Sequence, residues 1–108
     1  MQADKDPQIA AITVAELWHG IERATASHKS RREHYLRMIF NALPIVSYTQ
    51  KTALEHARIW AALESSGKMI SPYDLIVAAT ALERNSKVAT FNLRHFAQVP
   101  GLEVMVPA

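Results

Sequence analysis

The sequence predicts an α/β fold with a mostly parallel sheet, and three observations lead to that prediction. Short apolar or β-branched runs alternate with longer segments of helical periodicity along the 108 residues. Residues suited to start or end a helix separate these segments. The apolar fraction of 49% is ordinary for a globular protein of one domain. Strands that alternate with helices favour a parallel sheet covered by helices, so we expect a single domain over residues 1–108.

The N-terminal third begins with a predicted strand and helix. The apolar run at 8–12 is expected to form the strand, and a helix over 13–26 follows, with Thr13 as its N-cap. Apolar residues then recur at helical spacing and define a face that should pack into the core: Val14, Leu17, Trp18 and Ile21.

The middle of the chain should contain two helices with a strand between them. Ser30 is expected to begin the first helix, which Pro44 ends. The β-branched and aromatic content of 45–48 predicts the strand. A helix over about 50–65 follows, and Gly67 is suited to end it.

The most informative segment is an almost wholly apolar helix predicted over residues 72 to about 84. Ser71 is a natural N-cap, Pro72 fits the first helical position, and Asn85 is expected to close the helix. The apolar content predicts that this helix is largely buried, so its one early acid, Asp74, needs a partner such as a metal ion or a helix-end amide.

The C-terminal part is predicted to contain two further strands. The first covers 87–90, a turn with a short helical piece follows at 91–96, and the last strand covers 103–106. In open parallel sheets, sites form outside the carboxyl ends of the strands. Asn92 lies just after one such strand and Glu16 just after the first, so both are candidate site residues.

Composition and charge narrow the function classes. The chain has no cysteine, which excludes disulfides and thiolate metal sites, and no apolar run long enough to cross a membrane. The net charge is +2, with most of the cations between residues 23 and 37. This basic cluster fits a solvated helix face, or alternatively an edge that attracts phosphate. Trp18 and Trp60 have core spacing and are expected to pack rather than to stack on bases.

Two acids carry the functional prediction. Glu16 in Thr13-x-x-Glu16 and Asp74 in Ser71-x-x-Asp74 are each expected at the third position of a helix, in a capping box. Ser30-x-x-Glu33 repeats the pattern and indicates that capping alone can produce it. If the two acids meet, they and a third polar oxygen would suit a hard divalent cation such as Mg²⁺, which binds oxygen ligands and phosphates.

Three segments in order resemble the PIN-domain ribonucleases, and among them the VapC-like toxins of bacterial toxin–antitoxin pairs. Residues 12–17 (ITVAEL) with Gly20 resemble the segment of the second conserved acid, and 72–81 (PYDLIVAATA) that of the third. Residues 88–96 (VATFNLRHF), followed by 99–102 (VPGL), resemble the T-x-N-x-x-x-F and P-G-L ending. The resemblance covers nearly all of the chain from about residue 9 onward.

The resemblance implies a three-layer α/β/α sandwich and a Mg²⁺- or Mn²⁺-dependent endoribonuclease acting on single-stranded or loop RNA. It implies a cytoplasmic protein with a VapB-like antitoxin, a homodimer and no membrane association. The resemblance implies that the catalytic residues are Glu16, Asp74 and Asn92, with Glu16 and Asp74 as metal ligands. The substrate-binding residues would be Thr13, Thr90 and Arg94.

The chain also departs from the family pattern. The family has a first strand carrying an Asp in a pattern like L-D-T/S-x-V, and neither Asp4 nor Asp6 follows an apolar strand. The first strand is thus expected to be missing and the activity impaired. The chain is expected either to pair with another copy that fills the gap, or to be rearranged or marginally stable. Asn92 stands where many members have Asp, and His95 where another acid is common.

Two other hypotheses for the function of the chain stay open. It could be a non-catalytic, truncated PIN module that acts through dimerisation or antitoxin binding. It could also be a small helical domain that binds nucleic acid through the basic cluster at 23–37, in which case affinity would depend on salt but not on Glu16 or Asp74.

Overall fold

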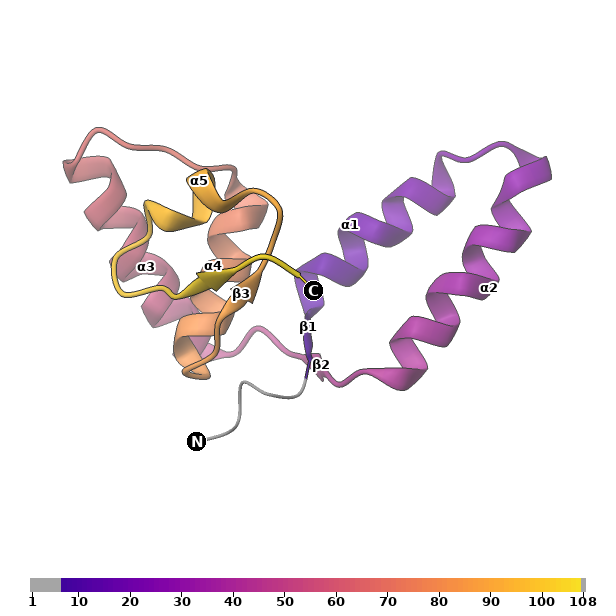
Figure 1. Ribbon diagram of the computed structural model, residues 1–108, viewed down its shortest axis with the longest axis horizontal. Helices are drawn as coiled ribbons and strands as arrows, with labels where there is room; N and C mark the ends of the chain where they lie inside the picture. Colours follow the sequence, from indigo (N-terminus) through magenta and orange to yellow (C-terminus); the bar gives the residue numbers. More distant parts are fainter. Residues whose placement is uncertain (1–6, 108) are drawn as a thin grey trace. The chain divides into compact units, whose positions relative to one another are not determined.

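The computed structural model describes residues 7–107, which divide into two compact units (Figure 1). We call Pro7–Ser47 the hairpin unit and residues 48–107 the core unit, and describe each by itself. The single domain over 1–108 stays a prediction. Asp4 and Asp6 lie outside the described residues.

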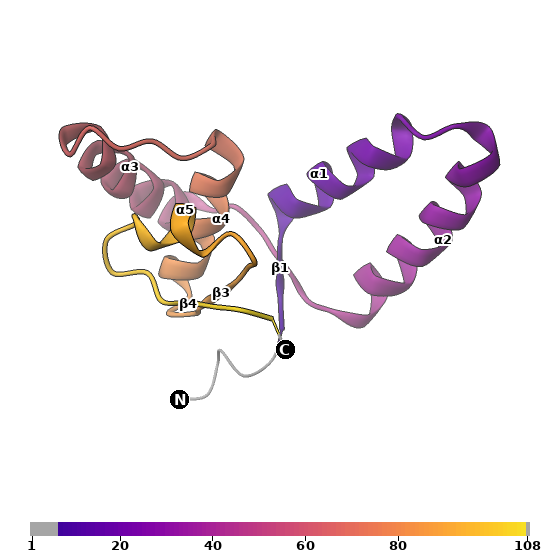
Figure 2. The ribbon, with the colours of Figure 1, turned by 45° about the horizontal axis from the view of Figure 1, so that its top comes forward.

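The hairpin unit consists of two helices between two short parallel strands. Its elements are β1 (Ile9–Ala10), α1 (Ala11–Glu22), α2 (Ala26–Ala42) and β2 (Ile45–Val46). Strand β1 pairs in parallel with β2, with Ile9 opposite Ile45 and Ala10 opposite Val46. Helices α1 and α2 run in opposite directions and are joined by a short turn (Figure 2). The strand pair therefore ties the two ends of the helical hairpin together.

Both hairpin helices begin earlier than the sequence predicts. Helix α1 begins at Ala11, and Ala10 at the N-cap position makes no side-chain capping bond. Thr13 and Glu16 therefore lie inside α1, so the predicted N-cap and the third-position carboxylate are wrong. Helix α2 begins at Ala26, which places Ser30 well inside the helix and removes the predicted capping box there.

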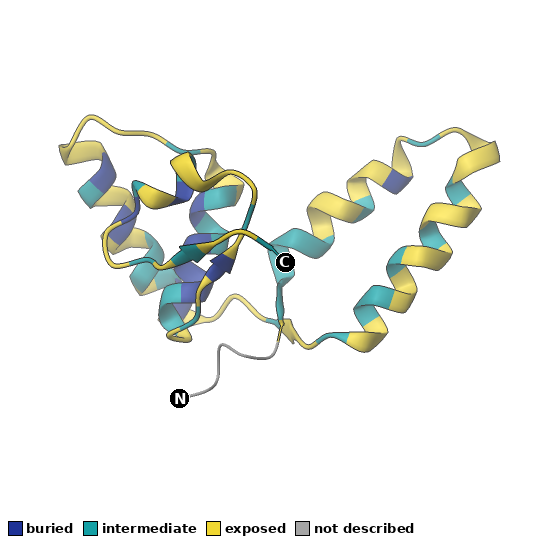
Figure 3. Cartoon of the chain, viewed as in Figure 1, coloured by how far each residue is buried: buried dark blue, intermediate teal, exposed yellow. Residues whose placement is uncertain are grey.

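The hairpin unit buries little of its surface. Among its described residues, Ile21 of α1 is the one buried side chain, 1% exposed, and α2 has none (Figure 3). Leu17, predicted to belong to the core face of α1, is exposed instead. Stability from apolar burial in this unit is accordingly small.

Gly20 offers a test of the helical conformation of α1. A Cβ added at this position would meet no atom within 4 Å, and no positive φ is required there. Replacement of Gly20 by Ala should raise the free energy of unfolding by about 0.5–1 kcal/mol, because glycine loses more backbone entropy on entering a helix. Urea denaturation followed by circular dichroism would measure the change, and a loss of stability would contradict the open position of this glycine.

The core unit contains three helices and a second pair of parallel strands. Its elements are α3 (Gln50–Ser65), α4 (Pro72–Glu83), β3 (Val88–Ala89), α5 (Leu93–Ala97) and β4 (Val104–Met105). In the parallel pair, Val88 lies opposite Val104 and Ala89 opposite Met105.

Local sequence determines where α3 begins and where α3 and α4 end. Thr49 caps α3 in a reciprocal arrangement with Thr52, in which each hydroxyl accepts the other residue's backbone N–H. Gly67 follows α3 with φ 69°, and Asn85 follows α4 with φ 54°. Both residue types tolerate this left-handed conformation, so the two predicted helix ends are confirmed.

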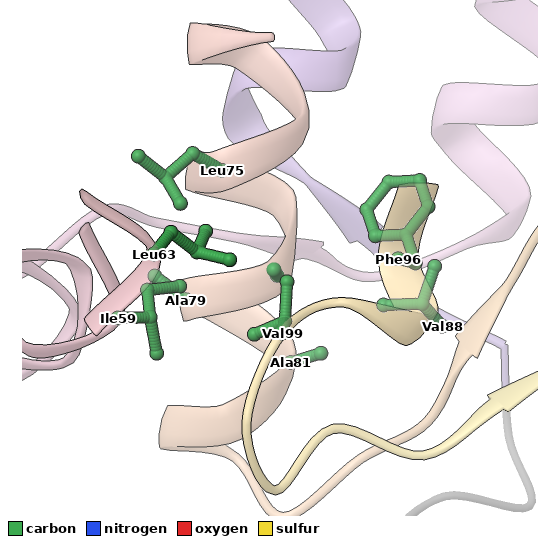
Figure 4. Packing of buried hydrophobic residues seen from close by; sticks show 9 residues of the cluster. Ile59, Leu63, Leu75, Ala79, Ala81, Val88, Phe96 and Val99 are labelled. Carbon is green, nitrogen blue, oxygen red and sulfur yellow. The ribbon is translucent and has the colours of Figure 1, made fainter. Parts of the chain in front are cut away.

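The hydrophobic cluster of the core unit forms where α3, α4 and the C-terminal segments meet (Figure 4). Ile59 and Leu63 of α3 face Leu75 and Ala79 of α4. The small side chains of α4 permit this close helix packing and explain why the almost wholly apolar helix is buried, as predicted. The buried members of the cluster are Ile59, Leu63, Leu75, Ala78, Ala79, Ala81, Val88, Phe96 and Val99.

Trp60 does not pack into this cluster. Its side chain is 52% exposed and stacks on His56, with ring centroids 5.5 Å apart. The packing role predicted for it is therefore wrong. Its neighbour Ile59 occupies the buried face of α3 instead, about 100° away around the helix.

The predicted α/β class with parallel strand pairing is confirmed by both units. Each predicted strand is present but contains two residues rather than four or five. None of the helices in the described part of the chain is long and apolar enough to cross a membrane.

Candidate active site

Asp74 lies in the first turn of α4, where the local sequence fixes its backbone. Helix α4 begins at Pro72, and the Oγ of Ser71 accepts the backbone N–H of Asp74 at 3.1 Å. Asp74 is therefore the third helical residue, as predicted. Its side chain is 27% exposed, so the carboxylate lies at the surface of the unit rather than within its core.

His95 of α5 approaches this carboxylate. Its Nδ1 atom lies 3.7 Å from Oδ2 of Asp74, an ion-pair distance when the imidazole is protonated. The distance is too long for a direct hydrogen bond. The two groups are thus neighbours whose contact is electrostatic rather than a direct hydrogen bond.

Asn92 completes the arrangement from the N-cap position of α5. Its side-chain Nδ2 lies 3.0 Å from His95 Nδ1, and its backbone N–H is donated to Thr90 Oγ1 at 2.9 Å. The Thr90 bond fixes the turn between β3 and α5. Asn92, His95 and Asp74 therefore form one cluster, which we call the Asp74 cluster.

The Asp74 cluster exists because two helix starts meet within one unit. The Ser71 cap orients the first turn of α4, and the Thr90 turn orients the first turn of α5. Asn92 and His95 are three residues apart, so they share a face of α5. Which atom of the Asn92 amide faces the ring depends on the tautomer of His95, since oxygen would accept from a protonated Nδ1 and nitrogen would donate to a bare one.

The other predicted site residues belong to both units, and each is described within its own unit. Glu16 lies exposed on α1 of the hairpin unit and Asp74 on α4 of the core unit, so their convergence on one cation stays a prediction. Thr13 is half-buried inside α1. Thr90 has a demonstrated role in the turn, and Arg94 is exposed on α5 beside His95.

The donor set of the Asp74 cluster suits a divalent cation in part. Within residues 7–47 or within 48–107, no three His, Cys, Asp or Glu side chains gather as a complete metal site. The cluster offers one carboxylate, one amide and one imidazole, which is a mixed oxygen and nitrogen set. Carboxylate and amide oxygens bind Mg²⁺ or Mn²⁺, with water filling the remaining positions, so these residues fit such an ion as part of a larger ligand set.

His95 was noted in the sequence as standing where another acid is common, but it was not predicted as a site residue. The signal for it was present in the Asn92-x-x-His95 spacing at the start of a helical segment. The contact with Asp74 joins residues that are far apart along the chain, and no local pattern predicts such a contact.

Comparison with known proteins places these features in a family. The PIN domain family model matches residues 3–102. The chain is 30% identical over 96 residues to the tRNA(fMet)-specific endonuclease VapC of Salmonella typhimurium, covering 89% of this chain and 71% of that protein. It is 32% identical over 94 residues to ribonuclease VapC2 of Haemophilus influenzae, covering 87% and 70%. The crystal structure of DNA-bound VapBC from Salmonella typhimurium superposes with a TM-score of 0.86 at 31% identity, covering 91% of this chain and 73% of that one.

Proposed function

Since the chain belongs to the PIN-domain family and, within it, to the VapC ribonucleases, we propose that it is a divalent-metal-dependent endoribonuclease toxin. The substrate we propose is single-stranded or loop RNA, whose unpaired bases and backbone are both accessible to a protein. The observation that carries the proposal is the Asp74 cluster, which brings together three polar side chains at the start of a buried helix.

In this proposal Asp74 and Glu16 hold Mg²⁺ or Mn²⁺, and Asn92 assists through its amide oxygen. When bound, the cation supplies Lewis-acid chemistry, activating water and neutralising charge at the phosphodiester. Ser71 keeps Asp74 in place through the backbone, so the carboxylate is directed by the first turn of α4.

The other proposed site residues orient the cluster or bind substrate rather than react. His95 would orient Asn92, whose amide lies 3.0 Å from its Nδ1, while the same nitrogen lies 3.7 Å from the Asp74 carboxylate. Arg94, exposed on the same short helix, would attract a phosphate of the RNA. Thr90 would act through the turn that positions Asn92, and Thr13 would contact substrate from the hairpin unit.

The proposed partners follow from the family. Solved relatives include a VapBC complex of toxin with antitoxin, which supports a VapB-like antitoxin for this chain. The homodimer and the cytoplasmic location are proposed from family membership. The impairment expected for this form stays a prediction.

Metal removal tests the proposal. Cleavage of single-stranded RNA should stop in EDTA and return when Mn²⁺ is added in excess. Mn²⁺ binding, followed by electron paramagnetic resonance of the free ion, should weaken in Glu16→Gln because one of two carboxylate ligands loses its charge. Cleavage that persists in EDTA would contradict the metal-dependent mechanism, and unchanged Mn²⁺ binding by Glu16→Gln would remove Glu16 from the site. Absence of both cleavage and Mn²⁺ binding would favour the non-catalytic module.

A further inference from the structure

The hairpin unit contains a groove between α1 and α2 with a volume of about 420 Å³. Its floor is apolar, formed by Leu17, Ile21 and Leu36. Its rim is formed by three long side chains of α2, namely Arg31, Arg32 and Tyr35. All of these residues lie in one unit, so the groove belongs to the hairpin itself.

The side chains on the other face of α2 are paired within the hairpin. Lys29 lies 3.6 Å from Glu22 of α1, and Arg37 lies 3.2 Å from Glu33. The guanidinium of Arg37 also stacks 4.8 Å from the ring centroid of Trp18. The cations on this face thus have partners already.

The two arginines at the rim of the groove differ in this respect. Both are exposed, and within the described residues neither Arg31 nor Arg32 takes part in an ion pair. Arg31 precedes Tyr35 and Arg32 precedes Leu36 by one helical turn, so the two charges lie beside one ring and one apolar side chain of the groove. The hairpin therefore has one face with paired cations and one with unpaired cations around an apolar floor.

We propose that this groove binds a segment of the single-stranded RNA substrate. Arg31 and Arg32 contact phosphates, and Tyr35, whose side chain is 64% exposed, stacks on a base above the apolar floor. The inference rests on the proposed ribonuclease function, because that function supplies the RNA. A second copy of the chain would bring the same unpaired cations to an isologous contact and be repelled.

Gly20 leaves space in the groove. It contributes to the groove lining, and a Cβ built there meets nothing within 4 Å. A leucine at this position would fill the groove without altering any charge. It provides a variant that separates the apolar contact from the electrostatic one.

The test measures binding without cleavage. Fluorescence anisotropy of a labelled oligouridylate of about twelve nucleotides, in EDTA and over a range of salt, gives both the affinity and its salt slope. In Arg31→Gln/Arg32→Gln, the slope of log K against log salt should become shallower by about 1.4, since each lost phosphate contact on a single strand contributes about 0.7. Gly20→Leu should weaken binding about 10-fold while the slope changes little, since a base loses its stacking place but the charges remain.

Arg37→Gln is the control from the same helix: it removes one arginine charge, against two in the double variant, at a position already paired with Glu33. Its salt slope should stay within a few tenths of the parent value. Equal slopes in Arg37→Gln and the double variant would overturn the proposal, as would unchanged affinity in Gly20→Leu. Thermal melting by circular dichroism checks that each variant is folded.

The outcomes also separate this inference from the proposed function. Binding that depends on Arg31 and Arg32, in a protein that never cleaves RNA, would uphold the groove and contradict the nuclease. Cleavage with unaltered RNA affinity in the double variant would uphold the nuclease and contradict the groove. If the double variant instead loses binding to an acidic helical peptide and keeps its RNA affinity, the occupant is a protein and the proposal is wrong.

Discussion

Asp74→Asn is expected to lower the rate of RNA cleavage by about 100-fold or more, a loss like that of one group that stabilises a transition state electrostatically. The substitution keeps the size of the side chain and the backbone N–H that Ser71 accepts, so α4 should begin as before. What it removes is the negative charge that would attract the cation. Single-turnover cleavage of single-stranded RNA at saturating Mn²⁺ measures the effect.

The control for this variant lies on the same helix. Glu83, the last residue of α4, carries a carboxylate that accepts a hydrogen bond from Thr52 at 3.4 Å, outside the Asp74 cluster. Glu83→Gln should leave the cleavage rate near that of the parent protein. An Asp74→Asn protein that cleaves RNA as fast as the parent would show that this carboxylate has no catalytic role.

Ile59→Ala should reduce the free energy of unfolding by about 2–5 kcal/mol, the range for truncating a fully buried aliphatic side chain. Ile59 is 0% exposed and contacts the hydrophobic cluster between α3 and α4. The lost contacts and the remaining cavity both contribute, because neighbouring helices can close only part of the space. Guanidinium denaturation monitored by circular dichroism measures the change in midpoint.

Leu54→Ala is the matched control, since Leu54 lies on the same helix and is 65% exposed. Its effect should stay within about 0.5 kcal/mol, as for most surface substitutions. If both variants were equally stable, the hydrophobic cluster would not be the main source of stability in the core unit.

The helix boundaries of the core unit could be predicted from the sequence because their signals are local. The helix predicted over 50–65 matches α3, and the predicted ends at Gly67 and Asn85 are confirmed by their positive φ angles. These residue types are suited to a left-handed backbone whatever surrounds them. The Ser71 cap and the following helix were predictable for the same reason.

The hairpin helices were predicted less well because their starts carry no strong capping signal. Helix α1 begins at Ala11, directly after β1, so the end of that strand rather than a capping side chain determines the boundary. Thr13 and Ser30 are therefore helix-interior residues that happen to precede an acid by three positions. A capping pattern predicts a helix start only where the preceding backbone is extended.

The candidate site was partly predictable. Asp74 and Asn92 each follow from a local helix or turn signal, and both belong to the cluster found in the structure. His95 could not be inferred in the same way, since its contact with Asp74 is created by the packing of α5 against the core unit. Glu16 was predicted at a helix start from the Thr13-x-x-Glu16 pattern, but that pattern lies inside α1.

The short helix α5 links the site to the interior of the core unit. His95 and Phe96 are consecutive, yet the first borders Asp74 while the second is buried in the hydrophobic cluster. Five residues are too few to stay helical unaided, so burial of the phenyl ring is what anchors the imidazole. Any loosening around that ring would misplace the histidine while the rest of the protein remained folded, so damage to activity could originate at a residue that never meets the RNA.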